Sequence, residues 1–138
     1  MNRELLKRIR ELAGDRCDYC RMPRAYDPLP FQFDHVIARQ HGGETVLDNL
    51  AWCCLHCNKH KGPNIAGIDP LSGDVARLFH PRQQRWARHF RWHGATLIGL
   101  TKIARATIRV LAINDPDAVA FRAELMDEGV FDMASNEA

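Results

Sequence analysis

The sequence predicts a small α+β protein with an N-terminal helix, a compact core held together by cysteines, and a C-terminal hairpin followed by helices. Three observations support this fold class. Apolar residues recur at helical spacing near the N-terminus, apolar and polar residues alternate over a short stretch after residue 30, and two Cys-x-x-Cys pairs enclose that stretch. The length of 138 residues, with 46% hydrophobic and 26% charged side chains, is typical of one globular domain spanning residues 1–138.

The first half of the chain predicts a helix, a strand and two short segments around the second cysteine pair. The spacing of leucine and isoleucine predicts a helix over residues 2–12, which Gly14 ends. The alternating sequence FQFDHVI predicts a strand at 31–37. Residues 47–53 are expected to form a short helix or turn, and residues 58–62 a short helix.

The rest of the chain is predicted to extend this core. Proline, glycine and aspartate make residues 63–75 a predicted loop. Residues 89–92 and 95–100 flank a His-Gly turn and predict a hairpin. Two helices are expected after it, one capped by Thr101 and ending at Leu111 or Ile113, and one running from Asp115-Pro116 to Met126.

Charge is distributed unevenly along the chain. Residues 1–74 hold ten basic and ten acidic side chains, residues 75–114 hold eight basic and no acidic ones, and residues 115–138 hold seven acidic ones and Arg122. Fifteen of the nineteen cations are arginine, whose planar guanidinium binds phosphate through two parallel hydrogen bonds. A basic segment beside an acidic tail fits either a nucleic-acid-binding surface or a solvated helix face, and charge alone does not separate the two.

The sequence also bears on where the protein works. It holds no run of about 18 apolar residues, which excludes a membrane-spanning helix. The N-terminal segment lacks the apolar core of a signal peptide, so we expect a cytoplasmic protein.

Five cysteines in a chain expected in the reducing cytoplasm favour metal binding over disulfides. Cys17 and Cys20 form one Cys-x-x-Cys pair and Cys54 and Cys57 form the second, with 33 residues between the pairs. Each pair presents two thiolates from one tight turn, and two pairs complete a tetrahedral zinc site. Because such a site has no open position, we expect zinc to hold the fold and not to catalyse a reaction. Cys53 fits the turn less well and is the spare cysteine.

The residues between and after the cysteine pairs resemble a known family. The sequence CDYC is followed by FDHVIARQHGGETVLDNLAWCCLHCNKHKG, which resembles the HNH endonucleases with a zinc-stapled ββα-metal core. The match covers residues 17–62, which are 46 of the 138 residues. The resemblance implies a nuclease core at 17–62, an extension at 63–138, and metal-dependent nicking or cleavage of DNA.

Carried over position by position, the family pattern makes His35 the general base and Asn49 the residue that orients it. It makes Asp34 and Asn58 the ligands of one catalytic divalent metal, with His60 as the reserve ligand. The family has either histidine or asparagine at the position of Asn58, so the resemblance implies an H-N-N variant whose oxygen donors suit Mg²⁺ or Mn²⁺. The chemistry requires these residue types, because phosphodiester hydrolysis needs a base and a cation that stabilises negative charge.

The aromatic and basic residues after residue 60 have different expected roles. We expect Trp86, Phe90 and Trp92 to pack the extension onto the core, and Tyr19 to pack the first cysteine pair in the same way. The side chains expected to contact the phosphate backbone of DNA are Lys61, Arg82, Arg85, Arg88 and Arg91.

Two alternatives to a nuclease that acts alone follow from the same sequence. A non-catalytic zinc module that binds DNA or RNA would use the cysteines and arginines but would have no use for Asp34, His35 and Asn58 together. A nuclease subunit would instead depend on a homodimer or a larger assembly. The expected partner is DNA, with no membrane and no small-molecule substrate.

Overall fold

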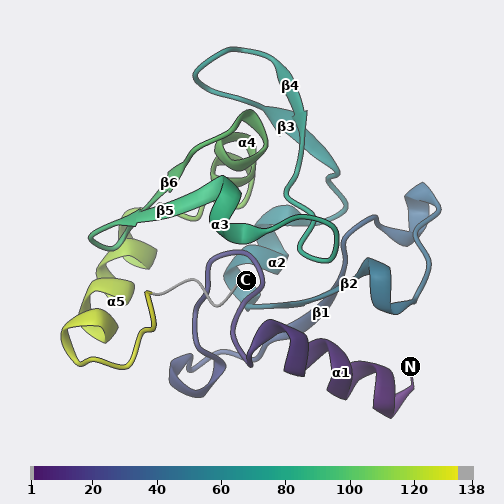
Figure 1. The fold of residues 1–138 in the computed structure, drawn as a ribbon, viewed down its shortest axis with the longest axis horizontal. Coiled ribbons are helices and arrows are strands. Elements are labelled where there is room, and N and C mark those ends of the chain that lie inside the picture. Colours follow the sequence, from purple (N-terminus) through teal and green to yellow (C-terminus); the bar gives the residue numbers. More distant parts are fainter. Residues whose placement is uncertain (1, 134–138) are drawn as a thin grey trace.

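The computed structural model describes residues 2–133, so residues 1 and 134–138 of the predicted domain lie outside the description. The core is built from a helix, an antiparallel hairpin and a second helix that follows the hairpin directly (Figure 1). These elements are α1 (Arg3–Ala13), β1 (Gln32–His35), β2 (Leu50–Cys53) and α2 (Leu55–Lys61). The predicted α+β fold with a small ββα core is therefore confirmed.

The extension adds two further hairpins and three helices. They are β3 (Ala66–Ile68) paired with β4 (Val75–Arg77), β5 (Phe90–His93) paired with β6 (Thr96–Gly99), α3 (Trp86–His89), α4 (Lys102–Val110) and α5 (Pro116–Asp127). Helix α4 packs against β3, β4 and β6 (Figure 1). The second hairpin and both terminal helices are as predicted, and the hydroxyl of Thr101 caps α4 by accepting a 3.1 Å hydrogen bond from the amide of Ala104. None of the described helices is long and apolar enough to cross a membrane.

The prediction of a helix or turn for residues 47–53 is wrong for residues 50–53. Only Leu47–Asn49 form a 3₁₀ turn, and Leu50–Cys53 continue as strand β2. All four residues of β2 are buried, and the ring of Trp52 stacks against that of Phe33 across the hairpin with centroids 4.7 Å apart. This pairing with a strand 18 residues earlier decides the conformation, because so short an apolar segment has no periodicity of its own.

Helix α2 also begins earlier than the predicted residue 58. The sulfur of Cys54 accepts a 3.4 Å hydrogen bond from the amide of Cys57 and so acts as the N-cap of the helix. A cysteine is not a usual cap residue, and this is why the sequence pattern did not reveal the start. As a result Leu55, His56 and Cys57 lie on the helix together with Asn58.

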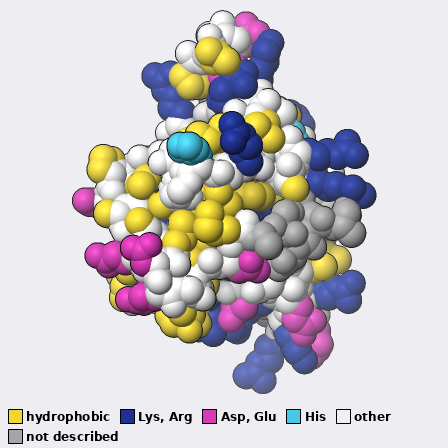
Figure 2. All heavy atoms as spheres, turned by 60° about the vertical axis from the view of Figure 1, so that its left-hand side comes forward, with side chains coloured by type: hydrophobic (Ala, Val, Ile, Leu, Met, Phe, Trp, Pro, Cys, Tyr) yellow, Lys and Arg dark blue, Asp and Glu magenta, His cyan; other side chains and the backbone are white. Residues whose placement is uncertain are grey.

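The loop predicted for residues 63–75 is also wrong, because it contains β3 and the start of β4. Gly67 allows this hairpin to lie directly on α4, since a Cβ atom at that position would lie 2.5 Å from Cγ2 of Val110. The tip of the hairpin projects from the top of the molecule and exposes hydrophobic side chains there (Figure 2). These include Ile68, Leu71 and Val75.

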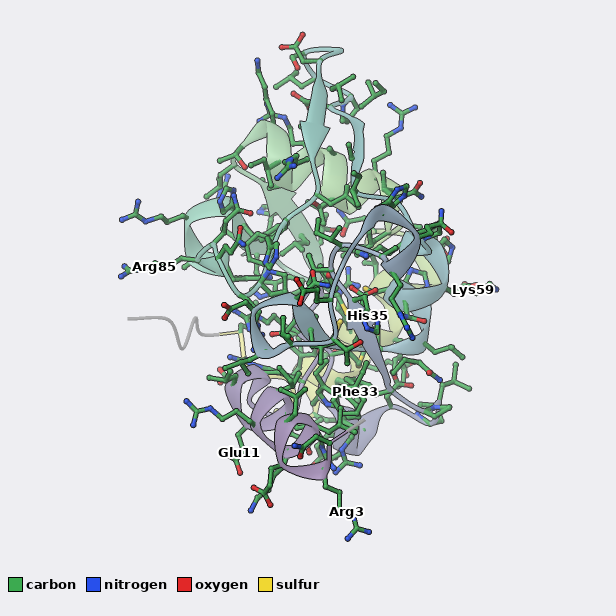
Figure 3. All side chains as sticks on the ribbon, turned by 90° about the vertical axis from the view of Figure 1, so that its right-hand side faces the viewer. Arg3, Glu11, Phe33, His35, Lys59 and Arg85 are labelled. Atoms are coloured by element: carbon green, nitrogen blue, oxygen red, sulfur yellow. The ribbon has the colours of Figure 1, made fainter. Side chains whose placement is uncertain are left out.

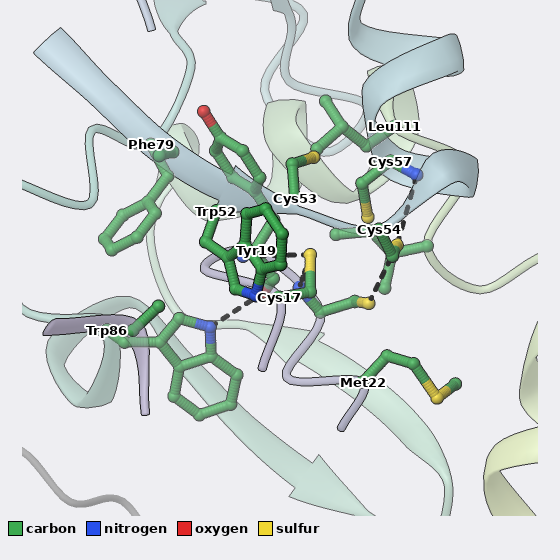
Figure 4. Packing of buried hydrophobic residues seen from close by; sticks show 14 of the residues in the cluster. Cys17, Tyr19, Met22, Trp52, Cys53, Cys54, Cys57, Phe79, Trp86 and Leu111 are labelled. Atoms are coloured by element: carbon green, nitrogen blue, oxygen red, sulfur yellow. Dashed lines mark hydrogen bonds between the residues drawn. The ribbon is translucent and has the colours of Figure 1, made fainter. Parts of the chain in front are cut away.

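The core joins the two halves of the chain. One cluster of buried hydrophobic residues extends from Ile9 of α1 to Phe131 after α5. Trp86 and Phe90 are buried within it, as predicted, and the indole nitrogen of Trp86 donates a 2.8 Å hydrogen bond to the carbonyl of Tyr19 (Figure 4). The extension is thus anchored to the turn that carries the first cysteine pair.

Candidate active site and zinc centre

The two Cys-x-x-Cys pairs meet in the core. The sulfur atoms of Cys17, Cys20, Cys54 and Cys57 all lie within 4.8 Å of one another, and all four residues are buried (Figure 4). A zinc–sulfur distance of about 2.3 Å places the corners of a regular tetrahedron about 3.8 Å apart. The sulfurs of Cys20 and Cys54 are 3.7 Å apart, so the cluster fits a structural zinc ion.

Cys53 lies in the same core but is not part of this cluster. Burial raises the pKa of the Cys53 thiol well above its ordinary value. The prediction that Cys53 is the spare cysteine is borne out by its position outside the four-sulfur cluster.

Asp34 is buried on β1 between the first cysteine turn and α2. Its Oδ2 atom accepts a 2.8 Å hydrogen bond from the hydroxyl of Tyr19, and its Oδ1 atom accepts one of 3.2 Å from Nζ of Lys61. Burial raises the pKa of Asp34, and the charge of Lys61 and the hydroxyl of Tyr19 oppose that rise. Each carboxylate oxygen therefore has one protein partner and retains a second lone pair that can face a metal.

His35 follows on the same strand and is half-buried. Its Nε2 atom is hydrogen-bonded to the hydroxyl of Thr45 at 2.8 Å. When Nε2 carries the proton and donates the hydrogen bond to the hydroxyl of Thr45, Nδ1 has a free lone pair. This is the tautomer that a general base requires.

Asn49 holds the loop between β1 and β2. Its Oδ1 atom accepts a 2.8 Å hydrogen bond from the amide of Ile37, and its Nδ2 atom donates to the carbonyls of Ile37 and Glu44 at 3.0 and 2.9 Å. Gly43 closes the same loop, because a Cβ atom there would lie 1.7 Å from the carbonyl oxygen of Ile37. Asn49 thus holds the loop that carries Thr45, the hydrogen-bond partner of His35, and no described contact joins Asn49 to the imidazole.

Asp34, His35 and Asn58 line one open cleft of about 280 Å³. Figure 3 shows the face of the molecule on which His35 lies. Carboxylate and amide oxygens from β1 and α2 meet in this cleft, and this donor set fits Mg²⁺ or Mn²⁺. His60 is not among the described residues that line the cleft, and its Nδ1 atom is hydrogen-bonded to the carbonyl of His56 at 2.8 Å.

The comparison with protein families agrees with this geometry. Residues 17–64 match the family model described as HNH endonuclease. The chain carries an HNH domain. No curated protein and no solved structure matches the chain. The HNH domain indicates a nuclease-type function with metal binding and a nucleic-acid substrate.

Two of the five cations predicted to contact DNA have buried side chains, namely Lys61 and Arg82. The ammonium of Lys61 is fully buried and ion-paired with Asp34. The guanidinium of Arg82 is 8% exposed and ion-paired with Asp18 at 2.5 Å. The prediction of direct phosphate contact is therefore corrected for Lys61, whose ammonium is fully buried against Asp34, whereas Arg82 also lines a cleft and has an unpaired Nε atom. The three other arginines are exposed: Arg85 precedes α3, Arg88 lies on α3, and Arg91 lies on β5.

Three residues of this site escaped sequence reasoning. Tyr19 was expected only to pack, Thr45 had no expected role, and Arg39 lines the cleft beside His35. Arg39 follows the Asp-His pair by four residues, and a basic residue so near a predicted base is a usable signal. Thr45 gave no such signal, because its role depends on how the loop folds back on the strand.

Proposed function

We propose that this chain is a metal-dependent endonuclease that hydrolyses phosphodiester bonds of DNA. The observation that supports it best is that His35, whose Nε2 atom is hydrogen-bonded to Thr45, lines one cleft together with Asp34 and Asn58. We propose that His35 takes a proton from the attacking water through Nδ1 while Thr45 fixes the ring through Nε2.

Asp34 and Asn58 would hold the divalent metal of the HNH domain in this proposal. When bound, such a cation stabilises negative charge on the phosphate and on the leaving oxygen. Tyr19 and Lys61 hold the carboxylate of Asp34 in place. Arg39 lines the cleft and supplies positive charge for the phosphate, and His60 stays the reserve ligand.

The zinc ion has no catalytic role in this proposal. It holds the cysteine turn against α2 and so fixes the floor of the cleft. We further propose that residues 1–138 act as one nuclease domain, with a core at 17–62 and an extension at 63–138. The continuous hydrophobic core from Ile9 to Phe131 supports this. The exposed arginines Arg85, Arg88 and Arg91 are proposed to contact the DNA backbone.

A plasmid-cleavage assay with zinc-loaded protein tests the proposal. Supercoiled DNA is incubated with Mg²⁺, Mn²⁺ or EDTA, and wild type is compared with His35→Ala and His41→Ala. We expect metal-dependent nicking that His35→Ala lowers by a factor of about 10²–10⁴, the usual contribution of a general base. His41 is an exposed histidine of the loop between β1 and β2, so His41→Ala is expected to cleave like wild type.

Two results would count against the nuclease. Folded, zinc-loaded wild type that binds DNA but never cleaves it would favour the non-catalytic binding module. If size exclusion separates the protein into species of different mass and only a species heavier than the single chain cleaves DNA, a nuclease subunit of an assembly would be favoured.

A further inference from the structure

A second cleft, of about 500 Å³, lies between the end of α1, the first cysteine turn and the segment that leads into α3. Four arginines line it, namely Arg16, Arg21, Arg82 and Arg85. Two carboxylates, Glu11 and Asp18, also line it. It shares no lining residue with the cleft at His35.

Two of these arginines have buried groups without a hydrogen-bond partner. The Nε atoms of Arg16 and Arg82 are buried, and no acceptor for them exists in the described part of the chain. Both side chains are 8% exposed, and each makes one ion pair through its terminal nitrogens, Arg16 with Asp132 at 3.7 Å and Arg82 with Asp18. An unpaired buried N–H group is costly, and an anion bound in the adjacent cleft is one way to satisfy it.

The carboxylates do not neutralise the cleft. The oxygens of Asp18 accept hydrogen bonds from Arg82 and from the backbone amide of Trp52, and Glu11 is exposed. The guanidinium of Arg21 stacks over the ring of Trp86 at 4.7 Å, which holds it in place. Four arginines against Glu11, Asp18 and Asp132, the partner of Arg16, leave one excess positive charge, and arginine forks match the geometry of phosphate.

A third groove, called the connecting groove here, shares lining residues with both clefts. Its hydrophobic floor includes Phe33 and Trp52, and three basic residues of α1 line it, namely Arg3, Lys7 and Arg10. It shares Phe33 with the cleft at His35, and Glu11 and Gly14 with the arginine cleft. Phe33, His35, Glu11 and Arg85 all appear on the face that Figure 3 presents.

We propose that the arginine cleft binds a backbone phosphate of the same nucleic-acid strand that is cleaved at His35. The strand would follow the connecting groove, with bases against Phe33 and phosphates beside the basic residues of α1. This inference depends on the proposed function for the identity of the strand. The binding site itself can be tested without cleavage.

The test measures binding of a fluorescein-labelled single-stranded oligonucleotide by anisotropy, with His35→Ala in every variant so that no cleavage occurs. Arg85→Gln is the test variant because Arg85 is exposed and its loss leaves the core intact. Arg109→Gln is the control, since Arg109 is an exposed arginine of α4 that lines none of the three clefts. We expect Arg85→Gln to weaken binding about 5-fold and to lower the slope of log K against log salt by about 0.7, the value for one single-strand phosphate contact.

A second measurement locates the phosphate. The Nε–Hε resonances of Arg16 and Arg82 are followed by NMR while the oligonucleotide is added, and we expect both to shift. Binding by Arg85→Gln that equals binding by Arg109→Gln, or resonances that stay in place, would overturn the proposal. Resonances that shift only with inorganic phosphate would also overturn it, because the cleft would then bind a free anion. Wild-type protein that binds in this way but does not cleave plasmid would refute the nuclease and leave the phosphate site intact.

Discussion

The hydroxyl of Tyr19 donates a 2.8 Å hydrogen bond to Oδ2 of Asp34, which joins the zinc-binding turn to the strand of the candidate active site. Tyr19 lies between Cys17 and Cys20, so its backbone is fixed when the two thiolates bind zinc. Its ring is fully buried, and its carbonyl also accepts the hydrogen bond from Trp86. Tyr19 thus connects the first cysteine turn, the strand of the candidate active site and the extension.

Tyr19→Phe is expected to lower the free energy of unfolding by about 1–3 kcal/mol, because it leaves a buried carboxylate oxygen without its donor. Urea unfolding of the zinc-loaded protein measures this change. Tyr26→Phe removes a hydroxyl from a ring that is 48% exposed and should leave stability within about 0.5 kcal/mol of wild type. Equal stabilities for the two variants would show that the bond to Asp34 contributes nothing.

Zinc removal is expected to unfold the core. Binding of structural zinc contributes about 10–16 kcal/mol in small zinc domains. This exceeds or equals the total stability of a typical domain, about 5–15 kcal/mol. Cys17→Ser or Cys54→Ser should therefore abolish both zinc content and the cooperative unfolding transition, measured by metal analysis and circular dichroism.

Cys53→Ala is the matched control for the zinc prediction. It removes a buried sulfur next to a ligand but outside the cluster, so one zinc per chain should be retained. The expected cost is about 1 kcal/mol, which is typical of a small deletion in a packed core. A Cys54→Ser protein that unfolds cooperatively without zinc would contradict the structural role of the metal.

The parts of the fold that the sequence predicted are those in which the chemistry is local. Two thiolates three residues apart and the Thr101 cap depend on neighbouring residues, and both lie where the pattern placed them. The Asp-His pair on an alternating strand belongs to the same group, although its catalytic role stays a prediction.

The parts that the sequence did not predict depend on distant contacts. Arg82 and Arg85 are three residues apart in one basic segment, yet only Arg82 meets Asp18, which lies 64 residues earlier. Lys61 is buried for the same reason, because its partner Asp34 is 27 residues away. A single sequence cannot show which arginine or lysine of a basic segment finds a buried carboxylate.

Asn49→Ala is expected to loosen the loop from residue 37 to residue 45 without releasing zinc. It removes three hydrogen bonds, each worth about 1 kcal/mol, and leaves the amide of Ile37 unpaired. Thr45 would then no longer hold His35, so plasmid cleavage should fall while zinc content stays constant. Hydrogen exchange of residues 37–45 measures the loosening directly.

Asn49→Asp separates the donors of this side chain from its acceptor. It keeps the shape and the oxygen that accepts from Ile37, but it can no longer donate to two carbonyls. We therefore expect exchange and cleavage close to those of Asn49→Ala. Asp48→Asn changes an exposed neighbour and should match wild type. Normal exchange in Asn49→Asp would show that the two donated bonds do not hold the loop.

The ion pair between Asp69 and Arg105 is expected to make stability depend on pH. Arg105 donates two hydrogen bonds to the carboxylate, at 2.8 and 2.9 Å, and thereby fastens the β3–β4 hairpin to α4. These bonds hold the pKa of Asp69 well below its ordinary value, against the opposite effect of burial. A carboxyl group whose pKa is lower in the folded than in the unfolded state stabilises the fold above the unfolded pKa, about 3.9, and loses this effect as pH falls.

Asp69→Asn should therefore unfold at lower urea concentration than wild type at pH 7, and the difference should shrink only below about pH 4. The difference between the two proteins is the relevant quantity, because acid also protonates the zinc ligands of both. Asp74→Asn is the control from the same hairpin, since its pair with Lys102 is more than half exposed and such pairs contribute little. A difference between wild type and Asp69→Asn that stays constant from pH 7 to pH 3 would mean that hairpin packing, and not the charge of Asp69, holds β3 and β4 on α4.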